Sequence, residues 1–227
     1  MDAAPKIASG ITGEIAALSR RDTPSMRAIR KRWSKTLRGA PADEVLAVAA
    51  ILVSGADQTG KWLANEILRF HPAAFGAVTE AQIEDFAGRA QSWYAVDALG
   101  TILTGPLWAK GRLADVRIEA WSRSPHWWLR RSALVATVGL NALGSGGPGD
   151  AARTLAICRR LAPDREDMVV KALSWALRVL SQRDRPAVEA FLAEMGEMLA
   201  PRVRREVRHK LTTGLKTPRI GRNATPD

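Results

Sequence analysis

Helical periodicity, interrupted at short intervals, is the feature that most limits the folds open to this chain. Apolar residues recur at three- and four-residue spacing along almost the whole sequence. Proline and glycine interrupt the pattern, for example at Pro24, Pro41, Pro72, Gly105–Pro106 and Pro125. No segment shows the strict alternation and β-branched enrichment that are typical of strands. The pattern predicts helices over residues 11–20, 25–37, 42–53, 59–70, 80–89, 92–103, 113–123, 126–143, 150–161, 166–181, 186–199 and 202–213.

About a dozen helices of roughly 10 to 18 residues with short joints are typical of an α-solenoid, in which antiparallel helix pairs stack side by side. The repeat length is irregular, about 35 to 45 residues, and is closest to that of HEAT-like repeats. We therefore predict an all-α fold, a curved solenoid with a concave basic face. We expect one domain over residues 1–215 and a flexible basic tail over 216–227. The stretch GSGGPG at 144–149 is interpreted as a turn between repeats, with Asp150 as the N-cap of the next helix.

Composition narrows the class of protein. The chain has 227 residues, of which 46% are hydrophobic and 25% charged, as in ordinary globular proteins. No apolar run reaches the roughly 20 residues that span a bilayer, and the N-terminus lacks the features of a secretory signal. One cysteine excludes an internal disulfide, and the three histidines are too scattered to suggest a metal cluster. We expect no cofactor, no membrane partner and a cytoplasmic location, associated with the nucleoid if the source is bacterial.

The excess of positive charge indicates a polyanionic partner. The chain carries 34 Lys and Arg against 23 Asp and Glu, a net charge of +11. Basic residues concentrate in two runs, 20–38 and 202–222, in which Asp22 and Glu206 are the only acids. The two ends of a curved solenoid can flank one concave surface, so these runs would hold a nucleic-acid backbone from both sides. Two solvated helix faces are the alternative explanation, but the runs and the overall charge together favour DNA.

The stretch SWYAVDALG at 92–100 places Asp97 one helical turn after Trp93 and on the same face. Desolvating a carboxylate beside a large aromatic is costly, so Asp97 either pairs with a basic residue or meets a cation in a cleft. Two further tryptophans have charged neighbours at one-turn spacing: Trp128 with Arg131, and Trp175 with Lys171 and Arg178. Each alone is typical of a core aromatic beside a snorkelling side chain, but a HEAT-like stack could align all three helices along one inner surface.

Four blocks of the sequence resemble the AlkD-like DNA glycosylases, HEAT-like repeat proteins that excise alkylated purines. They are SWYAVDALG (92–100), HWWLRRSALVAT (126–137), MVVKALSWALRVLSQRD (168–184) and VRREVRHKL (203–211). Weaker helical similarity extends over most of the chain from position 42 onward. The order and spacing of the blocks are more specific than any one of them. The resemblance implies an α-solenoid that cradles duplex DNA and holds a lesion against a Trp–Asp–Trp cluster.

The resemblance also implies roles for individual residues. The catalytic carboxylate of the family corresponds to Asp97, and the aromatics that line the lesion site correspond to Trp93 and Trp175. The DNA-contacting arginine corresponds to Arg131, with Arg130 as the competing assignment. The residues expected to make further DNA contacts are Trp128, Lys171, Arg178, Arg204, Arg205 and Arg208.

One region departs from the pattern of the family. Members often place an aromatic near the start of their DNA-binding helices, whereas this chain has MRAIRKRWSK at 26–35. Trp33 is the candidate substitute, and the alternative is that the contact is absent.

These residue types fit the hydrolysis of cationic alkylpurine nucleotides. An N3- or N7-alkylated purine is already a good leaving group, and a fixed carboxylate can stabilise the positive charge that develops on the deoxyribose or orient water. Tryptophan faces attract cations and exclude water, which strengthens the field of the carboxylate. We therefore predict a monomeric, monofunctional glycosylase that acts on double-stranded DNA carrying alkylated purines. No lysine is required as a nucleophile, so strand cleavage is not expected.

Two other classes of function stay open at this point. One is a non-catalytic solenoid that binds distorted or branched DNA, and the other is a protein–protein scaffold. The corresponding alternative for Asp97 is an ion pair with Arg131 or another basic residue inside the helix stack.

Overall fold

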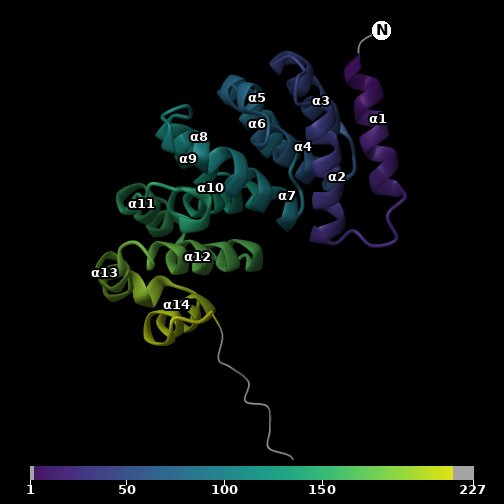
Figure 1. Cartoon of the computed structure of the whole chain (residues 1–227). Helices are drawn as coiled ribbons and strands as arrows, with labels where there is room; N and C mark the ends of the chain where they lie inside the picture. The colour runs from purple at the N-terminus through teal and green to yellow at the C-terminus, as the bar shows by residue number, and fades with distance from the viewer. Residues whose placement is uncertain (1–2, 217–227) are drawn as a thin grey trace, which may run out of the picture.

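The structure, a computed structural model, describes residues 3–216, and successive helices follow an arc from α1 to α14 (Figure 1). The α-helices are α1 (Ala3–Ala16), α2 (Thr23–Thr36), α3 (Ala42–Ser54), α4 (Gln58–Arg69), α5 (Pro72–Ala77), α6 (Glu80–Arg89), α7 (Trp93–Ala98), α8 (Gly105–Ala109), α9 (Asp115–Ser122), α10 (Trp127–Asn141), α11 (Ala151–Leu161), α12 (Asp167–Leu180), α13 (Arg185–Met195) and α14 (Pro201–Thr213). A π-helical turn, η1 (Leu99–Thr104), joins α7 to α8, and short 3₁₀ turns, η2 (Leu143–Ser145) and η3 (Gly196–Met198), follow α10 and α13. No strand occurs in residues 3–216, so the predicted all-α solenoid is confirmed.

Each helix packs on its neighbours along the arc. Successive contacts join α1 to α3, α3 to α4, α4 to α7, η1 to α10, α10 to α12 and α12 to α14. One cluster of buried apolar side chains runs from Ala4 in α1 to Val207 in α14. Within the described range, no helix combines the length and the apolar character needed to cross a bilayer. Of the predicted tail 216–227, all but the first residue lies outside the described part of the chain.

Local capping chemistry fixes several helix starts. The Asp22 side chain accepts a hydrogen bond from the backbone N–H of Ser25 and caps α2. The predicted cap at Asp150 is confirmed, since its carboxylate accepts from the N–H of Arg153 at 2.9 Å. Within the loop before it, Gly146 adopts a φ of 71°, a conformation that glycine reaches without a steric penalty.

The predicted first helix, 11–20, is wrong at both ends. α1 begins at Ala3 and ends at Ala16, because its buried stripe is formed by Ala4, Ala8, Ile11 and Ile15. The alanines at positions 4 and 8 are as fully buried as the isoleucines at positions 11 and 15. An alanine-based apolar face is weaker in hydropathy, so the periodicity alone starts the helix too late.

Two short helices begin where the sequence predicts only breaks. α5 starts at Pro72, and α8 carries Pro106 in its first turn. Proline is tolerated at position 72 because the first N–H groups of a helix have no intrahelical acceptor. Pro72 therefore starts a helix, whereas Pro106 follows η1 directly in a helical run that continues from α7, since Thr104 and Gly105 both have right-handed helical φ and ψ.

The predicted helix 92–103 is continuous in outline but contains the π-helical turn η1. The backbones of η1 and α10 approach so closely that a Cβ on Gly100 would lie 2.6 Å from a side-chain carbon of Val135. A Cβ on Gly105 would lie 2.7 Å from the Cα of Gly139 in α10. Glycine at these positions lets the end of α7 pack directly against α10, which carries Arg131.

Candidate active site

Asp97, near the end of α7, forms a bidentate ion pair with Arg131 of α10. The Arg131 Nε and Nη2 donate to Asp97 Oδ1 at 3.0 and 2.7 Å, and Nη2 also donates to Oδ2 at 2.9 Å. The remaining nitrogen, Nη1, donates to the carbonyl oxygen of Met168 at 2.6 Å. The Arg131 side chain is only 6% exposed, so its guanidinium is fully engaged in holding Asp97 and the N-terminal turn of α12. The ion pair that the sequence left open as an alternative is thus present.

The ion pair does not use all the hydrogen-bonding capacity of the Asp97 carboxylate. A carboxylate accepts about four hydrogen bonds, and Arg131 supplies three of them, leaving Oδ2 with room for another donor or a positive charge. The Asp97 side chain is 20% exposed and lines a cleft, so a ligand in that cleft can approach the carboxylate. Burial raises the pKa of Asp97, and the charge and hydrogen bonds of Arg131 oppose that rise. Asp97 is therefore a partly desolvated carboxylate that a second cation would stabilise.

The cleft in front of Asp97 has a volume of about 440 Å³. Its lining residues come from α7, α10, α12, α14 and the segment after α14: Trp93, Asp97, Arg131, Met168, Lys171, Trp175, Arg178, Arg202, Glu206 and Lys216. Trp93 is 56% exposed at its rim, whereas Trp175 is half-buried. The structure thus brings together the predicted carboxylate, both predicted aromatics and three of the predicted cations, although Trp175 lies far from Asp97 in sequence.

The cations on the α12–α14 side of this cleft already have acidic partners. Lys171 Nζ lies 2.5 Å from an oxygen of Asp167, and Arg202 Nε lies 2.8 Å from an oxygen of Glu206. Arg178 is buried, with Nη2 at 3.8 Å from Glu206. These three cations and two acids form a network that crosses from α12 to α14 and shapes the wall of the cleft, with one positive charge in excess.

Glu206 is the acid that two cations of that network share, Arg202 and Arg178. Its Oε2 accepts from the Ser174 hydroxyl at 2.6 Å, and its Oε1 accepts from Arg202 Nε at 2.8 Å. Burial by itself would raise the pKa of Glu206, but these hydrogen bonds and the charges of Arg202 and Arg178 outweigh it and lower the pKa. Glu206 therefore has two cationic neighbours that favour its ionised form, whereas Asp97 has only Arg131.

The other predicted DNA-contacting residues do not line this cleft. Arg130 donates to Asp164 at 2.7 Å and to backbone carbonyls, and Trp128 is partly buried with its ring 3.8 Å from that of Trp127. On α14, Arg204 lies near Glu197. Arg205 and Arg208 are exposed and form no ion pair among the described residues. Trp33 is turned away towards α1, where a Cβ on Gly10 would lie 2.9 Å from its ring.

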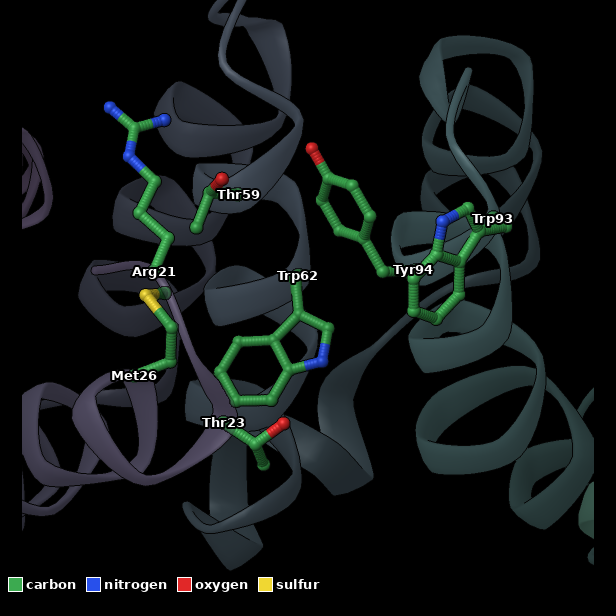
Figure 2. Close-up of a pocket in the computed structure, with 7 residues that line it drawn as sticks. All are labelled: Arg21, Thr23, Met26, Thr59, Trp62, Trp93 and Tyr94. Carbon is green, nitrogen blue, oxygen red and sulfur yellow. The ribbon is translucent and has the colours of Figure 1, made fainter.

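Two further hollows adjoin the Asp97 cleft on the side of α2 and α4. One, of about 600 Å³, shares Trp93 and Asp97 with it and is also lined by Trp62, Glu66 and Phe70. Another, of about 290 Å³, is shown in Figure 2 and is lined by Arg21, Thr23, Met26, Thr59, Trp62, Trp93 and Tyr94. Trp93 lines all three hollows, so they form one groove with Asp97 near its middle.

Sequence reasoning missed the aromatic residues of this half of the groove. In Figure 2, Trp62 lies between Met26 on one side and Trp93 and Tyr94 on the other. Trp62 has Glu66 one turn further along α4, which is the same spacing of tryptophan and charge that singled out Trp93. Tyr94 follows Trp93 directly in the chain. The sequence therefore contained both the Trp62–Glu66 spacing and the position of Tyr94 next to Trp93.

The described residues offer no cluster of metal ligands. Among residues 3–216, no three His, Cys, Asp or Glu side chains lie close enough together to hold a metal ion. His71 instead caps α5, where its Nδ1 accepts from the N–H of Ala74 at 3.1 Å.

Two comparisons with known proteins find a similar family and a similar fold. The chain matches a family model described as DNA alkylation repair enzyme over residues 21–211. It is also similar to a solved structure described as a predicted DNA alkylation repair enzyme from Enterococcus faecalis. The TM-score is 0.67 at 17% sequence identity, over 92% of this chain and 95% of that chain, so the likeness shows the fold. A search of curated proteins finds no match.

Proposed function

The chain belongs to the family of DNA alkylation repair enzymes, and from that premise we propose that it is a monofunctional DNA glycosylase. Its proposed reaction is hydrolysis of the N-glycosidic bond of N3- or N7-alkylated, cationic purines in duplex DNA. Asp97 is the proposed catalytic residue, and Trp93 and Trp175 are the proposed aromatic walls of the lesion site.

The observation that carries the proposal is the free acceptor on Asp97 in a cleft walled by two tryptophans. Arg131 fixes the carboxylate but leaves Oδ2 able to meet one more positive group. Trp93 and Trp175 line the same cleft, and the faces of their rings attract cations. A cationic base and a developing sugar cation are both ligands for such a site.

The proposed chemistry follows from the charge of the substrate. The alkylated purine leaves with the electron pair of the C1′–N bond and becomes neutral, while positive charge develops on the deoxyribose. The Asp97 carboxylate stabilises that charge and orients the water, which adds to C1′ and releases a proton. Because the leaving base starts out cationic, the reaction needs no strong general acid.

Arg131 acts in this proposal as a positioning residue. Its three hydrogen bonds hold the carboxylate in one orientation before the substrate arrives, and its positive charge favours the ionised form of Asp97, in opposition to burial, which raises the pKa. This replaces the direct DNA contact expected of Arg131 from the sequence. For Arg130, the ion pair with Asp164 supports a structural role.

The second candidate is a DNA-binding protein without catalytic activity. The ion pair itself favours it, because a carboxylate held by Arg131 needs no catalytic role to explain its burial. The two candidates differ in what the Asp97 charge is for, and a single substitution separates them.

The test is release of free base from methylated duplex DNA, followed by chromatography of the base and analysis of the DNA. A glycosylase releases N3- or N7-methylpurine and leaves an unbroken strand with an abasic site. The parent protein should do so under single-turnover conditions, and a folded Asp97→Asn variant that still binds DNA should not. Release at the same rate by that variant, or no release by the parent protein, would rule out the proposed mechanism.

A further inference from the structure

Glu66, on α4, is a second carboxylate in the groove, and the proposed reaction does not use it. It lies one helical turn after Trp62, and both residues line the 600 Å³ hollow together with Asp97 and Trp93. The Glu66 side chain is only 9% exposed. A carboxylate repels the phosphates of a duplex, so in a groove that receives DNA it calls for a cationic or N–H partner in the ligand.

The one ion pair of Glu66 within residues 3–216 is a loose one. Arg30 Nε lies 3.5 Å from Glu66 Oε2 and makes no hydrogen bond to it. The Arg30 guanidinium is instead stacked on Phe70, with its central carbon 3.8 Å from the centre of the ring. Burial raises the pKa of Glu66, and the charges of Arg30 and Arg27 oppose that rise. Glu66 therefore has a cation nearby but lacks the hydrogen bonds that a carboxylate normally accepts.

The Glu66 oxygens keep accessible surface on the hollow. Neither oxygen accepts a hydrogen bond from the described residues, yet neither belongs to the fully enclosed polar atoms, which include Arg30 Nε. Because Glu66 lines the hollow, a ligand there can reach this surface. A nearly buried carboxylate without a donor is unfavourable, so a ligand that supplies an N–H group gains a charge-assisted hydrogen bond.

Aromatic rings surround this carboxylate. Phe70 is 53% exposed and Trp93 is 56% exposed, although both are large apolar side chains. Trp62 and Tyr94 line the same hollow, and Figure 2 shows their rings beside that of Trp93. Nucleobases of every kind stack on aromatic side chains, and a hollow of this volume admits a ligand of that size. A flat base that carries an N–H donor thus complements both the rings and the carboxylate.

We propose that this hollow is a subsite for an unpaired nucleobase of the lesion pair, and that Glu66 accepts a hydrogen bond from the exocyclic amino group of that base. The assignment to the lesion pair rests on the proposed function, which puts the lesion at Asp97, on the border of this hollow. Displacing the lesion breaks its base pair and leaves Watson–Crick edges without partners. Adenine, guanine and cytosine carry an amino group on that edge, and glutamate accepts readily from such a group. Thymine and hypoxanthine carry none.

The first experiment changes the DNA and leaves the protein intact. Two duplexes carry a tetrahydrofuran abasic analogue opposite either cytosine or 2-pyrimidinone, which is cytosine without its amino group. A second pair places adenine or purine, which is adenine without its amino group, opposite the analogue. The parent protein should bind the amino-bearing member of each pair about tenfold more tightly, as expected for one hydrogen bond to a charged acceptor. Equal affinities within both pairs would overturn the proposal.

Variants of Glu66 then test whether its carboxylate is the acceptor. Glu66→Met removes the acceptor and should abolish the difference within each pair, whereas Glu66→Gln keeps an uncharged acceptor oxygen and should retain a smaller difference. The control is Glu189→Met, which makes the same change at an exposed glutamate of α13 and should keep the full difference. A difference that persists in Glu66→Met would overturn the proposal.

A purely structural role for Glu66 has another signature. Glu66→Met leaves Arg30, whose side chain is 13% exposed, without its counter-charge, so the melting temperature is measured in parallel. The double variant Arg30→Met/Glu66→Met removes both charges and provides a second protein without the acceptor. If Glu66 only stabilised the fold, affinity would fall equally for both members of each pair, and that result would overturn the proposal.

A last set of duplexes identifies the base that supplies the amino group. They contain 2′-fluoro-7-methyldeoxyguanosine, which resists hydrolysis because fluorine disfavours positive charge on the sugar. Replacing the cytosine opposite by 2-pyrimidinone, or the lesion by 2′-fluoro-7-methyldeoxyinosine, removes one amino group at a time. An affinity loss that is larger in the parent protein than in Glu66→Met assigns the amino group to the base opposite in the first case and to the lesion in the second. No such loss in either duplex would overturn the assignment to the lesion pair.

Failure of the glycosylase proposal is distinguishable from failure of the subsite. In that event the parent protein releases no base from methylated DNA, but its affinity for the abasic-analogue duplexes still depends on the amino group and on Glu66.

Discussion

Asp97 and Glu206 line the same cleft, and each faces an arginine from a neighbouring helix, yet their environments differ. Asp97 has one partner, Arg131, and keeps a free acceptor position. Glu206 accepts from Ser174 and Arg202 and also lies near Arg178. Burial dominates at Asp97 and raises its pKa, whereas hydrogen bonds and charges prevail at Glu206 and lower its pKa. Glu206 thus has two cationic neighbours, Arg202 and Arg178, whereas Asp97 has one, Arg131. We therefore expect Glu206 to stabilise the fold and Asp97 to be the carboxylate available for chemistry.

The largest expected effect is that of Asp97→Asn on the excision rate. The change is nearly isosteric and removes the charge that faces the developing sugar cation. We expect single-turnover excision to fall by about 10²–10³, equivalent to about 3–4 kcal/mol. The melting temperature should also fall by several degrees, because Arg131 stays buried without its counter-charge, so the rate is compared per folded molecule. Affinity for undamaged DNA should hold or rise because one repulsion with phosphate is gone.

The distinction between the two carboxylates would be wrong if the Asp97 charge served only the stability of the fold. An Asp97→Asn protein that melts far below the parent, with excision reduced only in proportion to the folded fraction, would assign Asp97 to the fold. Thermal unfolding, DNA affinity and excision are therefore measured on one preparation.

Glu206→Gln should show the opposite pattern. Removing the charge leaves Arg178 buried without its counter-charge and weakens the hydrogen bonds from Ser174 and Arg202. Hydrogen bonds to charged groups contribute about 1.5–3 kcal/mol, so the melting temperature should fall by roughly 4–10 °C. Below that temperature, excision per folded molecule should stay within about threefold of the parent, and a rate loss as large as that of Asp97→Asn would contradict the distinction.

Two consecutive residues of α12 sharpen the comparison further. Trp175 lines the cleft beside Asp97, whereas Ser174 is buried and holds Glu206. Trp175→Ala should reduce excision by about tenfold without weakening non-specific DNA binding, because an aromatic wall acts on the cationic lesion. Ser174→Ala should cost about 1 kcal/mol of stability and leave the rate alone.

Melting curves are needed for both variants, since loss of a buried tryptophan can itself cost about 3–5 kcal/mol. Trp175→Phe keeps an aromatic face and should recover most of the activity. A folded Trp175→Ala protein that excises at the parent rate would show that Trp175 has only a structural role.

The smallest expected effect is on the acid side of the pH profile. In the proposed mechanism only ionised Asp97 is active, so excision should decline as the pH falls and should be halved at the pKa of Asp97, which lies above the ordinary 3.8. Because this pKa is raised in the folded state, the contribution of Asp97 to stability diminishes as the pH rises through it, and acidification does not unfold the protein through this group. The pKa of Glu206 is lowered, so its stabilising contribution is present above the ordinary value of 4.5 and is lost only as the pH falls through the lower one.

The rate should therefore decline at a higher pH than the unfolding transition that Glu206 controls. The measurement is single-turnover excision and circular dichroism over the same pH series. Simultaneous loss of rate and helicity would contradict the separation between the two carboxylates.

The sequence predicts the helices better than it predicts their partners. Helical periodicity and proline spacing are local, and they correctly place Asp97 and Trp93 on one turn. The alanine face of α1 and the helix-starting role of Pro72 are also local but ambiguous, because small residues and prolines have more than one meaning in a helical chain. The ion pair of Asp97 with Arg131 depends on how α7 meets α10, a property of the stack that no spacing within one helix encodes. For the same reason the two basic runs look alike in sequence, although Arg202 has acidic partners in the structure and Lys35 has none among the described residues.

The close approach of η1 and α10 has a consequence for how this site can diversify. At Gly100, Gly105 and Gly139 an added methyl group would collide with the facing backbone or with Val135, so these positions admit almost no substitution. Trp93 and Lys171, in contrast, stand at the open rim of the cleft, where many side chains fit. In a mutational library over this region, we therefore expect almost no folded variants with substitutions at the three glycines of this contact (the glycine seam), and many at the rim. New lesion preferences can be selected at the rim while the seam keeps the carboxylate where it is.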